Sequence, residues 1–219
     1  MMITSHIFQV GGSDESYPAD ASIYLIVHNN EAALIDAGTG NGHDEVVENI
    51  RQAGVPLRNI KYLFITHCHY DHIGGLNGIR DAAGCKTVAH ELDAVYIEDG
   101  NSTVTAASWY GTFIEPAKID IKVQGKDADF KIGDMDIKFY HTPGHSPGSS
   151  VLSVVSDGKL VLFGQDVHGP LNDTILSNRR DYIKSLEFMI SLNADILCEG
   201  HFGVITGRDK VKRFIESFL

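Results

Sequence analysis

One short segment places three histidines and one aspartate within six residues, in the sequence Thr66-His67-Cys68-His69-Tyr70-Asp71-His72-Ile73-Gly74-Gly75. It directly follows the apolar run Leu63-Phe64-Ile65, which predicts a buried strand. Imidazole and carboxylate groups are the ligands that a hydrolytic Zn²⁺ site uses. The two glycines that close the segment allow backbone and site to approach each other tightly. The sequence therefore predicts metal ligands on a loop at the end of a strand, held by a rigid scaffold.

The pattern His-x-His-x-Asp-His resembles the metallo-β-lactamase-fold superfamily, and three later segments resemble the further ligand motifs of that family. These segments are His141 to Ser149, which contains His145, then Leu162 to Asp166, and Cys198 to His201. Leu34-Ile35-Asp36-Ala37-Gly38 resembles the early strand and turn of the family. The motifs follow the order of the family, and the resemblance runs from about Ser22 to about Gly207.

The resemblance implies a fold and a metal site. The fold is an α+β, four-layer αβ/βα sandwich in which the loops that carry the ligands converge at one edge. The cofactors are two divalent metal ions, Zn first, with Fe or Mn as alternatives. One ion is held by His67, His69, His145 and Asp166, and the other by Asp71, His72, Asp166 and His201, so that Asp166 bridges the two.

The same resemblance implies a hydrolytic mechanism. A hydroxide that bridges the two ions attacks the substrate, and one ion polarises the oxygen of the scissile group. Asp71 and His201 are the catalytic candidates, and Asp71 is expected to steer the hydroxide and shuttle its proton. Asp36 and Thr66 are expected to orient the imidazole ligands. No serine or cysteine nucleophile is then required.

Hydrophobic periodicity and turn residues predict hairpins that alternate with helices. Strands are expected at 23–27, 32–35, 60–65, 86–89, 149–155, 159–163 and 195–198, with a hairpin at 130–140 that turns at Gly133-Asp134. Helices are expected at 44–53, 75–83, 181–192 and 210–218. Together these elements predict two mixed sheets packed face to face, with helices outside.

Composition and charge restrict the class of protein and its partners. The 219 residues, 43% of them hydrophobic, predict one soluble domain over residues 1–219. No apolar stretch reaches the ~20 residues of a membrane span, and no signal peptide is recognisable, so we expect a cytoplasmic location without a membrane partner. The net charge of −11 argues against a nucleic acid partner and leaves a small-molecule substrate. The scattered Cys68, Cys85 and Cys198 suit a reducing compartment.

Candidates for substrate contact lie in two less regular segments. Residues 100–116 contain Trp109 and Tyr110 and form either a flap over the site or a surface segment, and an aromatic flap is also compatible with a homodimer. His168, two residues past Asp166, either faces the substrate or lies on the surface. His141 is expected to be a hydrogen-bonded structural residue. The histidines that lack neighbouring ligand residues, and are not expected to be catalytic, are His6, His28, His43 and His90.

At several positions this sequence differs from the motifs of individual branches of the family, and these differences narrow the range of expected functions. Asp166 stands where β-lactam-cleaving members use cysteine or serine, and Gly169 stands where quorum-lactone hydrolases carry a tyrosine. Phe202 and the end of the chain at Leu219 argue against the glutathione recognition of glyoxalase II-type thioester hydrolases. His69 argues against the flavodiiron branch, and no RNA-binding arm is recognisable.

The expected function is a compact, glyoxalase II-like, dinuclear hydrolase that cleaves a small ester, thioester or lactone. The alternative is a persulfide dioxygenase-like oxidoreductase with a single iron, held by His67, His145 and Asp166. A third hypothesis is a binding protein of the same fold that performs no turnover. The complete set of seven ligand positions favours two metals.

Overall fold

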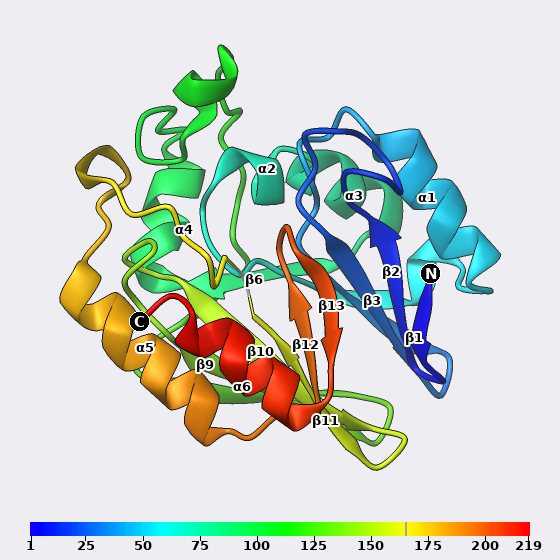
Figure 1. The fold of residues 1–219 in the computed structure, drawn as a ribbon. Coiled ribbons are helices and arrows are strands. Elements are labelled where there is room, and N and C mark those ends of the chain that lie inside the picture. Colours follow the sequence, from blue (N-terminus) through cyan, green and yellow to red (C-terminus); the bar gives the residue numbers. More distant parts are fainter. Residues whose placement is uncertain (165) are drawn as a thin grey trace.

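The computed structural model describes residues 1–164 and 166–219. Two mixed β-sheets pack face to face, and helices cover the outer face of each sheet (Figure 1). The order of layers is therefore helix, sheet, sheet, helix, which confirms the expected four-layer αβ/βα sandwich. Within the described ranges, no helix is long and apolar enough to cross a membrane.

The first sheet contains seven strands in the order of the sequence. Neighbours from β1 to β4 are antiparallel, whereas β4, β5, β6 and β7 run parallel. Between β3 and β4 the chain turns at Asn29-Asn30, whose φ angles of 48° and 64° are tolerated by asparagine and suit a tight hairpin. The strands are β1 (Met2–Thr4), β2 (Ile7–Gly11), β3 (Ile23–His28), β4 (Glu31–Ile35), β5 (Ile60–Phe64), β6 (Lys86–His90) and β7 (Ile121–Val123).

The second sheet contains six strands in the order β13-β12-β11-β10-β9-β8. β11 and β12 are parallel, and the other neighbours are antiparallel. The strands are β8 (Asp127–Ile132), β9 (Met135–His141), β10 (Ser150–Ser156), β11 (Lys159–Phe163), β12 (Ile196–Glu199) and β13 (Gly203–Thr206).

The longer helices divide between the two outer faces (Figure 1). α1 (His43–Gln52), α3 (Leu76–Ala83) and α4 (Glu91–Glu98) cover the first sheet, and α5 (Arg179–Ser191) and α6 (Arg208–Glu216) cover the second. α1 buries Val46, Val47 and Ile50, whose spacing places them on one face of a helix. The short helical elements are α2 (Tyr70–Ile73) and the 3₁₀ helices η1 (Leu57–Asn59), η2 (Ala107–Tyr110) and η3 (Asp173–Ile175).

Three hydrophobic clusters hold the four layers together. The central cluster fills the space between the sheets and contains Phe64, Phe139 and Phe163, each almost completely buried. The other two clusters lie between each sheet and its helices. Burial of one such aromatic side chain contributes roughly 1.5–3 kcal/mol, so the central cluster fixes the position of one sheet relative to the other. The loops at the strand ends are fixed with them.

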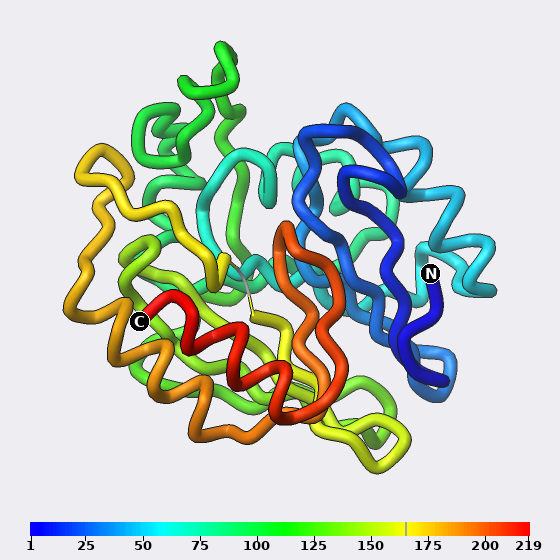
Figure 2. Tube along the Cα trace, viewed as in Figure 1, coloured from blue at the N-terminus to red at the C-terminus, as the bar shows by residue number. Residues whose placement is uncertain are grey.

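Strand direction brings the ends of four strands to one edge of the sandwich. β4 and β5 are parallel neighbours in the first sheet, and β11 and β12 are parallel neighbours in the second. The carboxyl ends of parallel neighbours lie at the same edge, where open α/β sheets commonly carry their sites. In the chain trace, the segments that follow β5, β11 and β12 lie near one another (Figure 2). These segments carry the candidate ligands.

The sequence pattern does not predict β1, β2, β7, β13 or α2. β1 and β7 have three residues each, too few for an alternation of apolar and polar side chains to be recognised. β13 begins with a glycine and is an edge strand that is only partly buried. The β8–β9 hairpin begins at Asp127 rather than at 130. The remaining strands and the helices α1, α3, α5 and α6 lie within a few residues of their expected positions.

Candidate metal centre

The histidine-rich loop is pinned at both of its ends. At its start, the carboxylate of Asp36 at the end of β4 accepts hydrogen bonds from the backbone amide and the hydroxyl of Thr66, at 2.8 and 2.7 Å. At its end, Gly74 and Gly75 pass so close to the loop after β4 that a Cβ on Gly75 would lie 2.2 Å from the carbonyl oxygen of Ala37. The glycines therefore permit a tight backbone approach, made here to the loop after β4 rather than to the candidate ligands.

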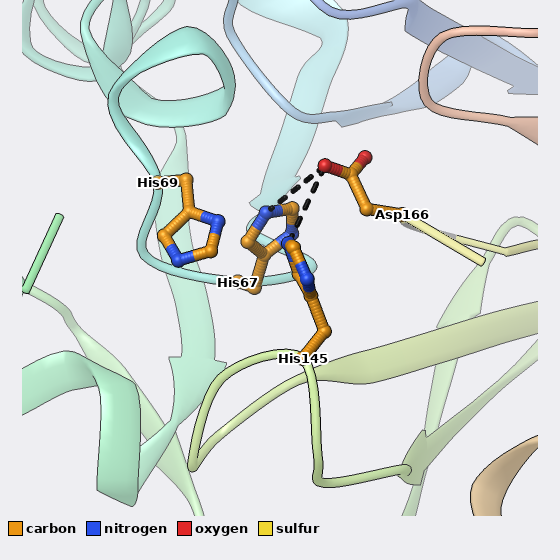
Figure 3. Close-up of side chains that lie close together, drawn as sticks. All are labelled: His67, His69, His145 and Asp166. Carbon is orange, nitrogen blue, oxygen red and sulfur yellow. Dashed lines mark ion pairs between the residues drawn. The ribbon is translucent and has the colours of Figure 1, made fainter. Parts of the chain in front are cut away.

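Two clusters of candidate ligand atoms lie side by side at the sandwich edge, and a third group, formed by Asp166, His168 and His201, overlaps both. In each cluster the nitrogen and oxygen atoms all lie within 4.8 Å of one another. Figure 3 shows one cluster, in which the imidazoles from two loops face the carboxylate of Asp166. Its members are His67, His69, His145 and Asp166, and the members of the other cluster are Asp71, His72 and His201. All seven positions singled out from the sequence thus come together.

Asp166 lies between the two clusters. Its Oδ2 atom is 3.8 Å from Nε2 of His67 and 3.4 Å from Nε2 of His145. Its Oδ1 atom is 3.1 Å from Nε2 of His72 and 3.3 Å from Nε2 of His201. The two oxygens of one carboxylate therefore face two different pairs of imidazoles.

Several polar atoms at this point are buried without a hydrogen-bond partner among the described residues. They are the Nε2 atoms of His67, His69, His72 and His145, and Oδ1 of Asp166. Buried polar atoms in native proteins are nearly always paired, so a convergence of five unpaired atoms needs an explanation. Neutral imidazole nitrogens and a carboxylate oxygen are the donors that Zn²⁺, Fe²⁺ and Mn²⁺ accept, so the residues present fit a metal site.

The opposite ring nitrogens are held by neighbouring groups. Nδ1 of His72 lies 2.8 Å from Asp36, and Nδ1 of His67 lies 3.0 Å from the hydroxyl of Thr66. Nδ1 of His145 lies 2.9 Å from the carbonyl oxygen of Pro170. A partner at Nδ1 fixes the ring orientation and leaves Nε2 facing the centre. Asp36 and Thr66 lie where the sequence predicted them, whereas a backbone carbonyl such as that of Pro170 has no signal in the sequence.

Burial and charge set the protonation of the candidate ligands. Burial lowers the pKa of His72, but the carboxylates of Asp166, Asp36 and Asp71 outweigh it and hold this pKa well above its usual range, so the ring would release a proton when a cation binds. Burial, reinforced by the neighbouring imidazoles, holds the pKa of His67 and His69 well below its usual range and keeps these rings neutral. Burial opposes the ionisation of Asp166, but the surrounding imidazoles, that of His72 first, outweigh it and hold the pKa of this carboxyl well below its usual range. The carboxylate therefore stays ionised in a buried place, where a divalent cation would balance its charge.

Glu199 supports the cluster from β12 and was not among the residues predicted for the site. The side chain is fully buried. Its Oε2 accepts hydrogen bonds from the backbone amides of His201 and Phe202, at 2.7 and 2.8 Å, and its Oε1 lies 2.9 Å from Nδ1 of His168. Glu199 thus positions the turn that carries His201. The available signal was a charged residue at the end of an apolar strand.

Asp93 is a second buried carboxylate that the sequence did not reveal. It lies in α4, and its oxygens accept hydrogen bonds from the backbone amides of Cys68 and Gly148, at 2.9 and 2.6 Å, and from the hydroxyl of Ser146. Cys68 stands between two candidate ligands, and Ser146 follows His145. One carboxylate therefore ties together the two loops that carry the histidines of the first cluster.

A cavity of about 220 Å³ opens directly onto the two clusters. Its wall includes all three residues expected to contact substrate, Trp109, Tyr110 and His168. Residues 100–116, shown in green at the top of Figure 1, therefore border the site through η2, while Phe113 of the same segment is 86% exposed. His168 is partly buried at the cavity wall.

The remaining histidines lie outside the clusters. His141 stacks on His90 with ring centroids 3.6 Å apart, and its Nε2 lies 2.9 Å from the carbonyl oxygen of Pro147. It is therefore the hydrogen-bonded structural residue that the sequence predicted. Among the residues that the structure describes, the metal-site clusters include none of His6, His28, His43 and His90.

Comparison with known proteins places these features in a family. The family model of the metallo-beta-lactamase superfamily matches residues 17–201. The probable metallo-hydrolase YqgX of Bacillus subtilis is 27% identical over 180 residues, which cover 77% of this chain and 81% of that protein. A probable metallo-hydrolase of Methanocaldococcus jannaschii is 27% identical over 145 residues, which cover 66% of each chain.

Solved structures show the same fold. A variant of the metallo-beta-lactamase from Cronobacter sakazakii superposes with a TM-score of 0.84 at 20% identity, over 100% of this chain and 92% of that one. The subclass B3 metallo-beta-lactamase BJP-1 of Bradyrhizobium japonicum gives a TM-score of 0.81 at 22% identity, over 100% and 89% of the two chains. The family match spans most of the chain and all seven candidate ligand positions. The chain belongs to the metallo-beta-lactamase superfamily.

Proposed function

We propose that this protein is a metal-dependent hydrolase that holds two divalent ions, Zn first with Fe or Mn as alternatives, and cleaves a small ester, thioester or lactone. The observation that carries the proposal is the position of Asp166, whose Oδ2 faces His67 and His145 while its Oδ1 faces His72 and His201. A carboxylate in that position can be shared by two cations. The description of two relatives as probable metallo-hydrolases supports the same class of enzyme.

Each ion would have four protein ligands and share Asp166. The first would be held by His67, His69, His145 and Asp166, and the second by Asp71, His72, Asp166 and His201. When bound, such ions supply an activated water at neutral pH and polarise the substrate oxygen.

The side chains would perform separate tasks around that chemistry. Asp71 lines the cavity, so its carboxylate can take a proton from the attacking water. The side chain of His201, whose Nε2 lies 3.2 Å from Asp71, is 32% exposed and is the most accessible of the seven, so solvent would reach the metal centre at this residue. Asp36 and Thr66 hold the rings of His72 and His67 in place.

A substrate panel tests the proposal. The protein reconstituted with Zn²⁺ is expected to hydrolyse members of a panel of aryl esters, thioesters and lactones, and a chelator is expected to abolish the activity. Asp166→Ala is expected to lose the activity. Its matched control is Asp173→Ala, an exposed change in η3, which is expected to keep the activity. Oxygen uptake with a small persulfide and no hydrolysis would overturn the hydrolase in favour of the single-iron oxidoreductase. If the protein bound metal but turned over no substrate of the panel, the hypothesis of a binding protein with this fold and no enzymatic activity would be favoured.

A further inference from the structure

We propose that the substrate of this enzyme is uncharged at both ends and presents a small apolar arm to Trp109. This inference rests on the proposed hydrolase function and names its substrate class. It follows from the walls of two cavities that share Tyr110 and His201 beside the metal centre.

The first cavity, here called the tryptophan lobe, is the 220 Å³ space that opens onto the metal centre. Away from the candidate ligands, its wall is mainly apolar, formed by Ala106, Trp109, Pro170 and Ile175. Its volume lies below the ~300 Å³ at which pockets for drug-sized ligands begin. The lobe therefore suits a short alkyl chain or one aromatic ring rather than a long acyl chain.

Exposed aromatic side chains continue this apolar wall to the outside. Trp109 is 50% exposed and Phe202 is 60% exposed. The ring of Phe202 packs edge-on against His168, with centroids 5.1 Å apart, and His168 lines the lobe. Exposed apolar side chains that gather beside a cavity are typical of a ligand-binding site.

The second cavity, here called the serine lobe, measures about 280 Å³ and lies on the other side of Tyr110 and His201, which border both lobes. Its wall includes Ser13, Ala19 and Ser22. It also contains Asp20, whose carboxylate is already occupied by the amide and hydroxyl of Thr39 and by the hydroxyl of Ser16. A substrate whose carbonyl lies at the metal centre would extend one arm into each lobe.

No lysine or arginine stands among the described residues that line either lobe. Proteins recognise carboxylates and phosphates mainly with arginine and lysine side chains. The carboxylate of Asp20 in the wall of the serine lobe disfavours an anion there further. A substrate with a carboxylate or phosphate on either arm would therefore find no lysine or arginine to pair with among the described residues of either lobe.

Matched esters test the charge preference. The metal-loaded enzyme is expected to cleave 4-carbamoylphenyl butyrate with a kcat/KM on the order of tenfold or more above that for 4-carboxyphenyl butyrate, because the second ester places a carboxylate in an uncompensated site. Equal or faster cleavage of the anionic ester would overturn the inference. Ala19→Arg is expected to raise the relative kcat/KM for the anionic ester, whereas Ala19→Gln, of similar size and no charge, is not.

Trp109 provides a readout that needs no turnover. It is the only tryptophan of the chain, so its emission reports occupancy of the tryptophan lobe. N-phenylbutanamide is expected to quench it with saturation, and N-phenylsuccinamic acid, which carries a carboxylate on the same chain, is expected to quench it much less. Equal quenching by both ligands, or by neither, would overturn the inference. If this difference is seen but no ester is hydrolysed, the hydrolase proposal fails and the substrate-class inference stands.

A side-chain test completes the design. Trp109→Ala is expected to raise KM for the neutral ester with little change in metal content, because Trp109 lines the cavity and belongs to none of the candidate ligand clusters. Phe113→Ala is the matched control, since Phe113 is an exposed aromatic of the same segment that lines a different cavity. If Trp109→Ala left the kinetics unchanged, the claim that the substrate presents an apolar arm to Trp109 would be wrong.

Discussion

The carboxylate of Asp93 accepts a hydrogen bond of 2.6 Å from the backbone amide of Gly148, which lies 55 residues further along the chain. The same carboxylate binds the amide of Cys68, inside the histidine-rich loop. These contacts set the spacing between His67 and His69 on one loop and His145 on the other. A residue that is not itself a ligand therefore determines the shape of the ligand cluster.

Asp93→Ala is expected to destabilise the fold. The change leaves two buried backbone amides, of Cys68 and Gly148, without their acceptor, and each unpaired group costs about 1–3 kcal/mol. We expect the free energy of unfolding in urea to fall by on the order of 3 kcal/mol. Asp99→Ala, at the exposed end of the same helix, is the control and should change it by less than about 0.5 kcal/mol. If the two variants were equally stable, the hydrogen bonds of Asp93 would not hold the loops of Cys68 and Gly148 together.

Asp166→Ala is expected to lose at least one metal ion and nearly all turnover. Both of its oxygens face imidazoles, so its removal takes a ligand from each proposed ion. Metal content by elemental analysis and kcat on an accepted ester are the measurements, with Asp173→Ala as the exposed control. Full metal content with normal kcat would rule out the bridging role.

Asp36→Asn is expected to weaken metal binding without removing a ligand. The carboxylate of Asp36 holds Nδ1 of His72 at 2.8 Å and pins Thr66, and changes at such positions typically cost about 10–100-fold in metal affinity. Competition with a chromophoric chelator measures the affinity. Asp44→Asn, an exposed change on α1, should leave it unchanged. An unaltered affinity in Asp36→Asn would mean that His72 needs no support from β4.

The candidate ligands and two of their supports, Asp36 and Thr66, could be predicted from the sequence, whereas the other supports could not. His67 to His72 form an unusual run at the end of an apolar strand, and the types and order of the later candidates match the family. Asp93 lies on a helix where an acidic residue is ordinary, and its partners are 25 to 55 residues away. Nothing local in the sequence distinguishes it from a surface aspartate such as Asp99.

The fold shows the same division between local and distant signals. The α1 helix could be predicted because Val46, Val47 and Ile50 repeat at the helical period. The three residues of β7 become a strand only because β6 offers them parallel backbone partners. The carbonyl of Pro170, which holds His145, is a backbone atom that any residue type would supply, so it leaves no trace in the sequence.

The cysteine thiols are expected to be unreactive in the folded protein. Cys68, Cys85 and Cys198 are free and buried, and burial raises the pKa of Cys85 to about 11 and that of Cys68 well above its usual range. A thiol reagent at pH 8 should therefore label none of the three in the native protein and all three in guanidinium chloride. Rapid labelling of a native thiol would contradict the packing described.

The same thiols predict how stability depends on pH. The folded protein keeps a proton on Cys85 up to about pH 11, whereas the unfolded chain loses it from about pH 9. The stabilisation is thus complete below about pH 9 and is lost as the pH rises from 9 to 11. Urea unfolding at several pH values measures this decline, and Cys85→Ala should show a smaller one. If Cys85→Ala showed an identical decline, the loss of stability would come from the titration of other groups.

The central claim is that two ions share Asp166, and the metal content of the protein purified without added metal or chelator tests it most directly. Elemental analysis against protein concentration should give about two divalent ions per chain, as Zn or as a mixture of Zn, Fe and Mn. About one iron per chain, unchanged after incubation with excess Zn²⁺, would contradict the dinuclear site and favour the single-iron oxidoreductase.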